Sequence, residues 1–599
     1  MNRKSIPVLV IFLIVFSSFH VSGFPLHKEN TILAFTEPAS STFPQQVLSF
    51  SRSVILAASI DDYISATPLA AKHHIPLILV SHPLTRIASF LSLYTPDHVY
   101  AVGETPFDAT PLTDEDLLVE TEPSTTEYVI IAKKHGEFSI VGDYLCAYHQ
   151  GTIIYADSLD DPIILETLQD CLPTYCALVW NPDEFECSAY VKTRLRFTCS
   201  LCTSTMPEFL LHTLARIDDD PYIDATFGFI TGSDVTDATL LLAREIVYDD
   251  LMGDWKHNAL FAPGFSTGET LCDTLDLTYI EKEQESYHAQ AFLDALNNGV
   301  KYACFFGHGT PINLLFDRTR NASDPHASHL VSCPQAHQYL INRGEQSVLI
   351  PENYTIFPTI FCMEACLTGL TGRVYDKKTG DPLTYDCQDF RNHSISLTLI
   401  RSGAAAYIGS STIGGIGATY PYLLASAYNW SLGDIVTHMN NKFIAHRLSY
   451  FIIPLYLYKY DPRIVLFGDP AFNPSHDIQT TCEDYYRVTT QETRLFGSEQ
   501  TTRVTIQHLN DFDVSFGKVE ITADTADTSS SLKLSNRVLL LNNIFHIHEF
   551  VSEELVGHRI EQHNEKIILY WTIDHPDVGM NTWHILVTPE RPWIYTIDD

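Results

Sequence analysis

Short apolar runs, separated by helix-like or turn-rich stretches, dominate the first 200 residues of the chain. Buried parallel strands have this pattern, because they are covered on both faces and show little alternation of apolar and polar positions. We therefore predict an α/β domain over residues 24–215. The runs interpreted as its strands are Val54–Ala58, Pro76–Val80, Val99–Val102, Val129–Ala132 and Thr152–Tyr155.

The same alternation continues over residues 220–475, which predict a second α/β domain. Its predicted strands are Phe227–Thr231, Tyr302–Phe306, Ile356–Cys362 and Ala404–Gly409, and its predicted helices are Asp237–Tyr248, Tyr287–Leu296 and Ile395–Ile400. The polar stretch from Gly309 to Asn353 interrupts the pattern and is interpreted as an inserted loop.

After Pro474 the pattern changes to alternation of apolar and polar residues, with turn residues between the segments. This period of two is typical of strands with one solvated face, so residues 484–599 predict a β-sandwich. Three segments carry the alternation most clearly: Thr502–His508, Gly517–Thr522 and Lys566–Thr572.

The N-terminus has the features of a signal peptide over residues 1–23. Arg3 and Lys4 precede an apolar run at 6–16, and small residues follow at 21–23. The run is shorter than the roughly 20 residues that a membrane span needs, although an uncleaved anchor is the alternative. No later stretch is long and apolar enough to cross a bilayer. We expect a secreted, extracellular protein with no membrane span after signal cleavage.

Composition excludes two classes of protein. The chain has 599 residues, of which 45% are hydrophobic, and this fraction is too high for a disordered chain. Its formal net charge is −36, whereas a duplex nucleic-acid binder needs clustered Lys and Arg. We therefore expect several folded domains and no nucleic-acid partner.

The chain has 13 cysteines, and export predicts that most of them form disulfide bonds. Because the number is odd, at least one thiol has no partner within a monomer. Cys199 and Cys202 have the spacing of zinc ligands, but no histidine-rich partner sequence accompanies them. We therefore predict no metal site there.

Two loops that follow predicted strands carry the chemistry. The first is Phe305–Thr310 and the second is Phe361–Gly369. In an open α/β sheet, ligands bind at the carboxyl ends of strands, so His308 and Cys366 are expected to meet there. The cysteine can supply a thiolate nucleophile, and the histidine can protonate a leaving amine. The backbone amides of Gly309 and Cys366 are candidates for an oxyanion hole.

Cysteines within the strands are rival nucleophiles. Cys304 and Cys362 lie inside the predicted strands, where a packed or disulfide-bonded cysteine is the simpler interpretation. We prefer Cys366, because it lies in a glycine-containing loop. A lone histidine in such a loop is often structural, so the pair is more specific than either residue alone.

These loops contain Gly307-His308-Gly309 and Ala365-Cys366-Leu-Thr-Gly369. With them the chain resembles the gingipain-type cysteine peptidases of the caspase-like group, which carry both blocks after strands. A helix, a small-residue strand and a Ser-Thr-rich loop then follow in that family, as in Ile400–Ile413, and a Gly-Asp-Pro-Ala element ends its catalytic region, as in Leu466–Ala471.

The resemblance implies a caspase-like cysteine peptidase domain over 220–475 and an immunoglobulin-like fold for the β-sandwich. It implies that His308 is the general acid/base and Cys366 the nucleophile of an endopeptidase that acts on proteins or peptides. His308 and Cys366 are further apart in sequence than the family leads us to expect, which the inserted loop explains. No residue is assigned as a third catalytic member.

Glu364 is the best indication of specificity. In caspase-like enzymes the residue two before the cysteine often lines the pocket for the side chain before the scissile bond. A carboxylate there attracts Arg or Lys. A legumain-type motif also contains Glu-Ala-Cys and implies Asn, and a loop-orienting or helix-capping role for Glu364 is equally open. The Ser-Thr-rich loop adds Ser410, Ser411 and Thr412 as candidate substrate-binding residues.

No cofactor is required by this chemistry, and calcium is compatible as a structural ion, since gingipain-type enzymes contain calcium sites. We assign no ligands to it.

The N-terminal region has a second, weaker resemblance. The order Asp62–Ala71, Ile75–Val80, His98–Gly103 is similar to a cell-wall-binding repeat of exported microbial proteins, which implies a cell-wall or surface polymer as partner. An ordinary α/β domain is the alternative.

Two other functions compete with the peptidase. The first is a catalytically inactive surface or cell-wall-binding protein that retains the peptidase fold, with Cys366 locked in a disulfide bond. The second is a thiol-dependent acyltransferase or ligase that uses the same two residues and transfers the acyl group to an amine.

Overall fold

The computed structural model describes a defined part of the chain. Side chains and backbone are described for residues 50–119, 124–159, 161–182, 225–262, 275–280, 288–316, 329–332, 356–365, 394–410, 430–437 and 464–475, with single residues and pairs such as 368–369 between these ranges. Backbone strands alone are described at 186–189, 348–349, 373–376 and within 486–595. Within these residues, no helix is both long enough and apolar enough to span a membrane.

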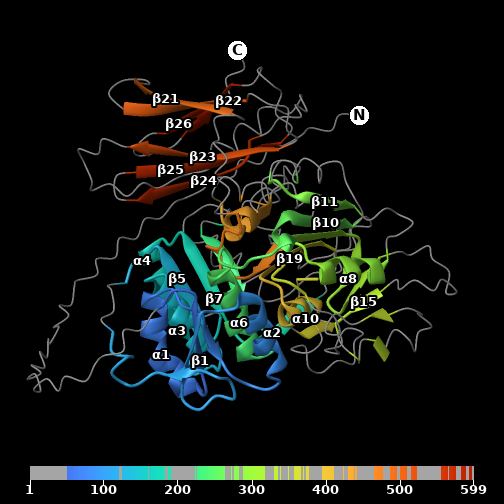
Figure 1. Cartoon of the computed structure of the whole chain (residues 1–599). Helices are drawn as coiled ribbons and strands as arrows, with labels where there is room; N and C mark the ends of the chain where they lie inside the picture. The colour runs from blue at the N-terminus through green and yellow to red at the C-terminus, as the bar shows by residue number, and fades with distance from the viewer. Residues whose placement is uncertain are drawn as a thin grey trace, which may run out of the picture. The chain divides into compact units, whose positions relative to one another are not determined.

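Ten of the described strands form one large sheet, the centre of the fold (Figure 1). Its order is β11 (Thr278–Glu281), β10 (Asn258–Ala262), β12 (Tyr302–Phe306), β17 (Ile360–Glu364), β19 (Ala406–Ser410), β20 (Ile464–Phe467), β9 (Thr226–Ile230), β7 (Tyr175–Val179), β5 (Tyr128–Lys133) and β6 (Thr152–Ala156). Strands β11, β10, β12, β17 and β19 are parallel to one another, and β20 is antiparallel to β19. The mixed α/β class predicted from sequence is confirmed.

The large sheet continues across the predicted boundary between the two α/β domains. Strand β7 pairs in parallel with β9, with Tyr175 opposite Thr226. Sequence pattern finds strands but gives no sign of which strands pair across a boundary, because the pairing depends on residues far apart in the chain. The residues of β5, β6 and β7 therefore belong to the same sheet as the candidate catalytic strands.

Strand β17 differs from its predicted bounds. It begins at Ile360 rather than Ile356, because Pro358 has no N–H to donate to the sheet. It also extends to Glu364, so the loop that carries Cys366 begins only at Ala365. Strand β12 has its predicted bounds, Tyr302–Phe306.

A second, four-stranded parallel sheet precedes the large one in the chain. Its order is β2 (Leu77–Leu79), β1 (Ser53–Ala57), β3 (His98–Val102) and β4 (Thr110–Pro111). Helix α1 (Ile60–Lys72) packs against α3 (Ser139–Tyr148), as Figure 1 shows. The Tyr144 hydroxyl of α3 donates to the Ile75 carbonyl at 2.7 Å, so the small sheet is fixed to a helix of the large one.

Helix α6 (Val235–Ile246) is buried along nearly its whole length. Its amino end is capped by Asp234, which accepts a hydrogen bond from the Asp237 N–H. Its polar side chains bond to the small sheet: the Thr236 hydroxyl donates to the Leu79 carbonyl at 2.9 Å, and the Leu79 N–H donates to Thr239 at 3.4 Å. The helix therefore joins the two sheets through hydrogen bonds as well as apolar packing.

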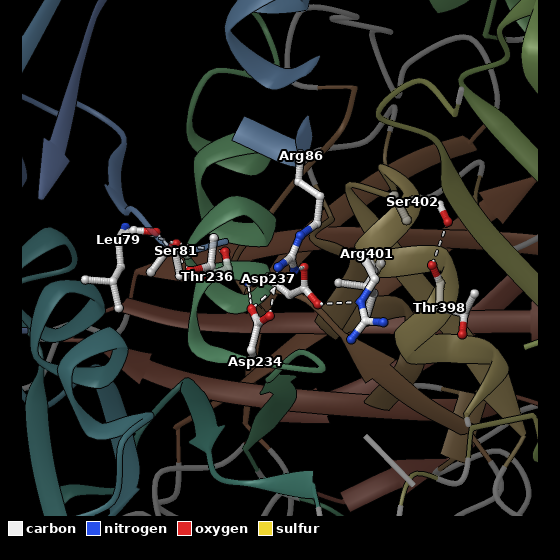
Figure 2. Close-up of polar contacts among 12 residues, drawn as sticks. Leu79, Ser81, Arg86, Asp234, Thr236, Asp237, Thr398, Arg401 and Ser402 are labelled. Carbon is white, nitrogen blue, oxygen red and sulfur yellow. Dashed lines mark hydrogen bonds and ion pairs between the residues drawn. The ribbon is translucent and has the colours of Figure 1, made fainter. Parts of the chain in front are cut away.

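A cluster of two arginines and two aspartates, of which Asp237 is buried and the others are partly exposed, lies at the amino end of α6 (Figure 2). Arg86, from α2 (Thr85–Tyr94), pairs with Asp234 at 2.8 Å and also with Asp237. Arg401, from α10 (Ile395–Ser402), donates to the other Asp237 oxygen at 3.2 Å. Asp237 thus connects α2, which follows strand β2 of the small sheet, to α10, which precedes β19.

A second polar cluster surrounds Asp469, which follows β20 in the Gly-Asp-Pro-Ala element. The Tyr128 hydroxyl donates to Asp469 Oδ1 at 2.7 Å, and His149 Nε2 lies 2.6 Å from Oδ2. Burial would raise the pKa of Asp469, but the charge of His149 and the hydrogen bonds from His149, Tyr128 and Ala471 lower it below its usual value. The Asp469 N–H donates to Glu245, whose pKa burial raises well above normal.

The lowered pKa of Asp469 predicts a pH-dependent contribution to stability. A carboxyl group with a depressed folded-state pKa stabilises the fold above its unfolded pKa of about 4, and this contribution is lost as the pH falls through the folded value. We expect His149→Gln to lower the free energy of unfolding by about 1–2 kcal/mol at pH 6. As the pH falls from 6 into the acid range, the free energy of unfolding of this variant should decrease less than that of wild type. Urea unfolding over this pH range measures both effects.

The matched control for this prediction is His257→Gln, which changes an exposed histidine. Its stability curve should run parallel to that of wild type. A His149→Gln curve that also runs parallel to wild type would show that His149 does not control the ionisation of Asp469.

After residue 485 the described strands form two antiparallel sheets. The first has the order β21 (Tyr486–Arg494), β22 (Gln500–His508), β26 (Thr582–Val587), β27 (Trp593–Tyr595), and the second β23 (Val514–Thr522), β25 (Lys566–Asp574), β24 (Leu555–His563). The three strands predicted most clearly lie within β22, β23 and β25. The immunoglobulin-like arrangement remains a prediction.

The remaining described elements cover the large sheet or lie in its connections. They are α4 (Pro162–Cys171), α8 (Ala289–Asn298), the 3-10 turn η2 (Asp254–His257), the sheet β13 (His308–Thr310), β14 (Asn313–Leu315), β15 (His329–Val331), β16 (Val348–Leu349), and the pair β18 (Arg373–Asp376) and β8 (Glu186–Ala189).

Candidate active site

The two candidate loops leave the sheet from neighbouring strands. Strands β12 and β17 are parallel, and their last paired residues are Phe306 and Glu364. The Gly307 N–H then donates to the Glu364 carbonyl at 3.4 Å, so the pairing continues for one more residue. His308 follows Gly307 directly, and Ala365 follows Glu364. The two loops therefore leave the carboxyl edge of the sheet at the same point.

His308 is exposed at the start of β13, the first strand of a small hairpin. The antiparallel register sets His308 opposite Leu315 and Gly309 opposite Leu314. Gly309, a predicted oxyanion donor, therefore lies next to His308 at the edge where the loops emerge. The stretch predicted as an irregular insertion thus contributes a strand of its own, because β14 pairs back onto the His308 segment.

The loop after β17 is fixed on both sides of Cys366, which lies outside the described residues. The Thr368 hydroxyl, two residues after Cys366, donates to the carbonyl of Ala365, the residue before it, at 3.0 Å. After Cys366, the Tyr407 hydroxyl donates to the Thr368 carbonyl at 3.1 Å, and the Gly369 N–H donates to the Ser410 carbonyl at 2.7 Å. These bonds attach the loop to the neighbouring strand β19.

Glycine is required where this loop meets β19. A Cβ atom on Gly369 would lie 3.0 Å from the carbonyl carbon and oxygen of Gly409, and a Cβ on Gly409 would lie 3.0 Å from the Gly369 nitrogen. Such contacts with backbone atoms cannot be relieved by rotating a side chain. The last glycine of Ala-Cys-Leu-Thr-Gly therefore allows the backbone of the loop to lie directly against the sheet.

Glu364 ends β17 with only 2% of its surface exposed. Because residues two apart in a strand share a face, Glu364 lies on the same face as Cys362, and its register partner Phe306 lies on that face beside it. Ser410, also buried, ends the adjacent strand β19. The structure thus brings Glu364 and Ser410 to one edge, whereas Ser411 and Thr412 lie outside the described residues.

The rival cysteines are buried within the sheet. Cys304 and Cys362 lie opposite each other in β12 and β17, and both are free thiols. Burial raises the pKa of Cys304 well above its usual value, and interactions with Cys362 and Glu364 raise it further. A buried thiol that resists ionisation is a poor nucleophile.

Several described cysteines are free in the structure, although export predicts that most form disulfide bonds. They are Cys146, Cys171, Cys176, Cys304 and Cys362. Burial raises the pKa of Cys176 to about 12, which keeps it protonated and unreactive. Cys199 and Cys202, where no metal site is predicted, lie outside the described residues.

The polar residues that hold the hairpin next to His308 have no counterpart among the predicted site residues. Thr310, Asn313 and His329 are linked by hydrogen bonds, and Asn313 and His329 are buried. Pro311 signals a turn at this place, but the partner His329 is distant in sequence and no local pattern indicates it. In the part of the chain that is described, no three His, Cys, Asp or Glu side chains gather as metal ligands.

Comparison with known proteins identifies the family. The model of peptidase family C25 matches residues 139–475, which is more than half of the chain. The chain belongs to peptidase family C25. It is therefore a cysteine-type peptidase whose substrates are proteins or peptides, as its resemblance to gingipains predicts. The match begins at the first residue of α3, so the family region includes β6 and β7 as well as both candidate loops.

Two solved structures are similar to this C25 peptidase. One is the Arg-specific cysteine proteinase gingipain R, with 14% identity, a TM-score of 0.35, and coverage of 80% of this chain and 100% of the solved chain. The other is the complex of pro- and mature domains of RgpB from Porphyromonas gingivalis, with 14% identity, a TM-score of 0.36, and coverage of 79% and 99%. No curated protein matches the chain.

Proposed function

We propose that the chain is a secreted cysteine endopeptidase with Cys366 as nucleophile and His308 as general acid/base. The parallel register of β12 and β17, extended by the hydrogen bond between Gly307 and Glu364, is the observation that supports this pairing most directly. It brings the residue before His308 and the residue two before Cys366 into contact.

The proposed reaction has two stages. The Cys366 thiolate attacks the peptide carbonyl carbon, and the backbone amides of Gly309 and Cys366 stabilise the oxyanion. As the carbon–nitrogen bond breaks, His308 gives its proton to the leaving amine, and a thioester remains. His308 then accepts a proton from water, whose oxygen attacks the thioester carbon; the carbon–sulfur bond breaks and releases the acid and the Cys366 thiolate.

We propose that Glu364 selects Arg or Lys before the scissile bond, and that Ser410, Ser411 and Thr412 line the substrate site. The burial of Glu364 supports this assignment, because a carboxylate shielded from water interacts more strongly with a cation that reaches it. Asn before the scissile bond is the alternative, since an amide can also bond to a carboxylate.

Glu364→Gln tests the specificity. We expect it to lower kcat/KM for Arg and Lys peptides by about 10²-fold, because a hydrogen bond to a charged group contributes roughly 1.5–3 kcal/mol. Hydrolysis of peptide amides with Arg, Lys or Asn before the bond measures this, with the Asn peptide as the internal control. An equal loss on all three peptides would show that Glu364 supports the loop instead of reading the substrate.

Export and accessory features complete the proposal. The charged, apolar and small-residue segments of positions 1–23 support a cleaved signal peptide and an extracellular location. We propose that calcium serves at most as a structural ion and that the N-terminal region contacts a cell-wall or surface polymer. Catalysis by a thiol and an imidazole needs no further cofactor.

A further inference from the structure

A buried chain of hydrogen bonds lies at the turn of the hairpin that begins with His308. The Thr310 hydroxyl donates to Asn313 Oδ1 at 2.6 Å, and Asn313 Nδ2 lies 3.3 Å from His329 Nδ1. Asn313 is 7% exposed and His329 is 6% exposed, so these bonds are shielded from water. Breaking one of them leaves a buried polar group without its partner.

The series of hydrogen bonds from Thr310 to His329 has a fixed direction. Because Asn313 Oδ1 accepts from Thr310, the amide nitrogen is left to donate toward His329. His329 Nδ1 must then be an acceptor, which requires the neutral ring with its proton on Nε2. The side chain at position 329 therefore has to offer an acceptor, and the one at position 313 has to offer both an acceptor and a donor.

The turn is anchored to the body of the domain. The Ile395 N–H, at the amino end of α10, donates to the Pro311 carbonyl at 2.8 Å. The Ser332 N–H, directly after β15, donates to the Ile312 carbonyl at 3.0 Å, and the Thr398 hydroxyl of α10 donates to the Ser332 carbonyl at 2.8 Å. The backbone of the turn is thus held by both α10 and the β15 segment.

His308 depends on this turn for its position. Strand β13 has only three residues, and its antiparallel partner is β14, in the register that sets Thr310 opposite Asn313. The side-chain bond from Thr310 to Asn313 closes that last pair, and the bond to His329 ties β14 to β15. A shift of the turn would therefore be transmitted along three residues to His308.

We propose that Asn313 and His329 are positioning residues that hold the His308 hairpin in its reactive place; this rests on the proposed role of His308. They act through the backbone of β13 and do not touch the substrate. Misplacing a catalytic group by about 1 Å can cost about 10²-fold in rate. Loss of either side chain should therefore lower kcat while leaving KM nearly unchanged, because the specificity pocket is formed by other strands.

Substitutions at the two positions separate this role from general loss of stability. We expect Asn313→Leu and His329→Leu to lower kcat by about 10²-fold per active site, counted by titration with a thiol-reactive peptide probe. His329→Gln keeps an acceptor for Asn313 and should recover most of the lost rate. Asn313→Asp keeps the acceptor for Thr310 but loses the donor, so it should remain impaired.

The matched control is Asn258→Ala in the full chain. Asn258 Nδ2 donates to the Gly299 carbonyl at 3.2 Å, at the amino end of β10 and away from the candidate loops. This variant should lose stability but keep the wild-type kcat per titrated site. Near-wild-type kcat in folded His329→Leu, or no recovery in His329→Gln, would overturn the proposal. A wild-type protein without Cys366-dependent turnover would instead remove the proposed function, and this inference with it.

Discussion

Cys366→Ala and His308→Ala are each expected to lower the rate of peptide hydrolysis by at least about 10⁴-fold. Without the thiol no acyl-enzyme forms, and without the imidazole neither the thiolate nor the leaving amine is assisted. Because the two residues act as a unit, the double variant should be no slower than either single variant. Initial rates with a peptide amide substrate, on protein that has undergone any activating cleavage, measure the loss.

Cys362→Ala is the matched control for this prediction. Cys362 is a buried cysteine of β17, four residues before Cys366 in the sequence, and it lies opposite Cys304 inside the sheet. Its replacement should retain activity within a fewfold of wild type. If Cys362→Ala abolished hydrolysis while Cys366→Ala did not, the nucleophile would have been assigned to the wrong cysteine.

Asp237→Ala is expected to cause the largest loss of stability. Its carboxylate is paired with Arg86 and Arg401 (Figure 2), and its side chain is fully buried. Burial would lower the pKa of Arg86, but the neighbouring Asp237 and Asp234 raise it, so the arginine stays charged. Without Asp237, Asp234 remains as the one carboxylate that this cluster offers to Arg86 and Arg401. Removing one partner of a buried ion pair costs about 3–5 kcal/mol. Urea unfolding of the full chain measures the change in the free energy of unfolding.

Two further variants test the origin of that loss. Asp254→Asn removes an exposed carboxylate and should change the free energy of unfolding by less than about 0.5 kcal/mol. Combining Asp237→Ala with Arg86→Met should destabilise less than the sum of the single variants, because the second change removes the excess positive charge that the first one leaves in the cluster. Simple additivity of the two single effects would mean that Asp237 and Arg86 are not coupled.

The fold could be predicted from sequence as far as local pattern reaches. Buried runs such as Val129–Ala132 and Tyr302–Phe305 identify strands because both faces are covered. The pattern does not show that β7 continues the sheet of β9, since pairing is set by contacts between distant residues. It also places the start of β17 too early, where Pro358 prevents pairing.

The candidate site could be predicted where a short motif has its own physical reason. Glycine is needed at position 369 for contact with β19, and this requirement makes the cysteine loop recognisable. The support for the histidine loop could not be predicted in this way. Asn313 and His329 form their hydrogen bond only after β14 and β15 have paired, so no spacing in the sequence reveals it.

Mapping a covalent adduct tests the central claim most directly. Processed wild type, Cys366→Ala and His308→Ala would be treated with peptide acyloxymethyl ketones carrying Arg, Lys or Asn, and the modified residue would be located by mass spectrometry. We predict a single adduct on Cys366 that forms only when His308 is present, with preference for the Arg and Lys probes. Absence of labelling in the processed protein, with Cys366 found in a disulfide bond, would contradict the account and indicate an inactive, surface-binding member of the family.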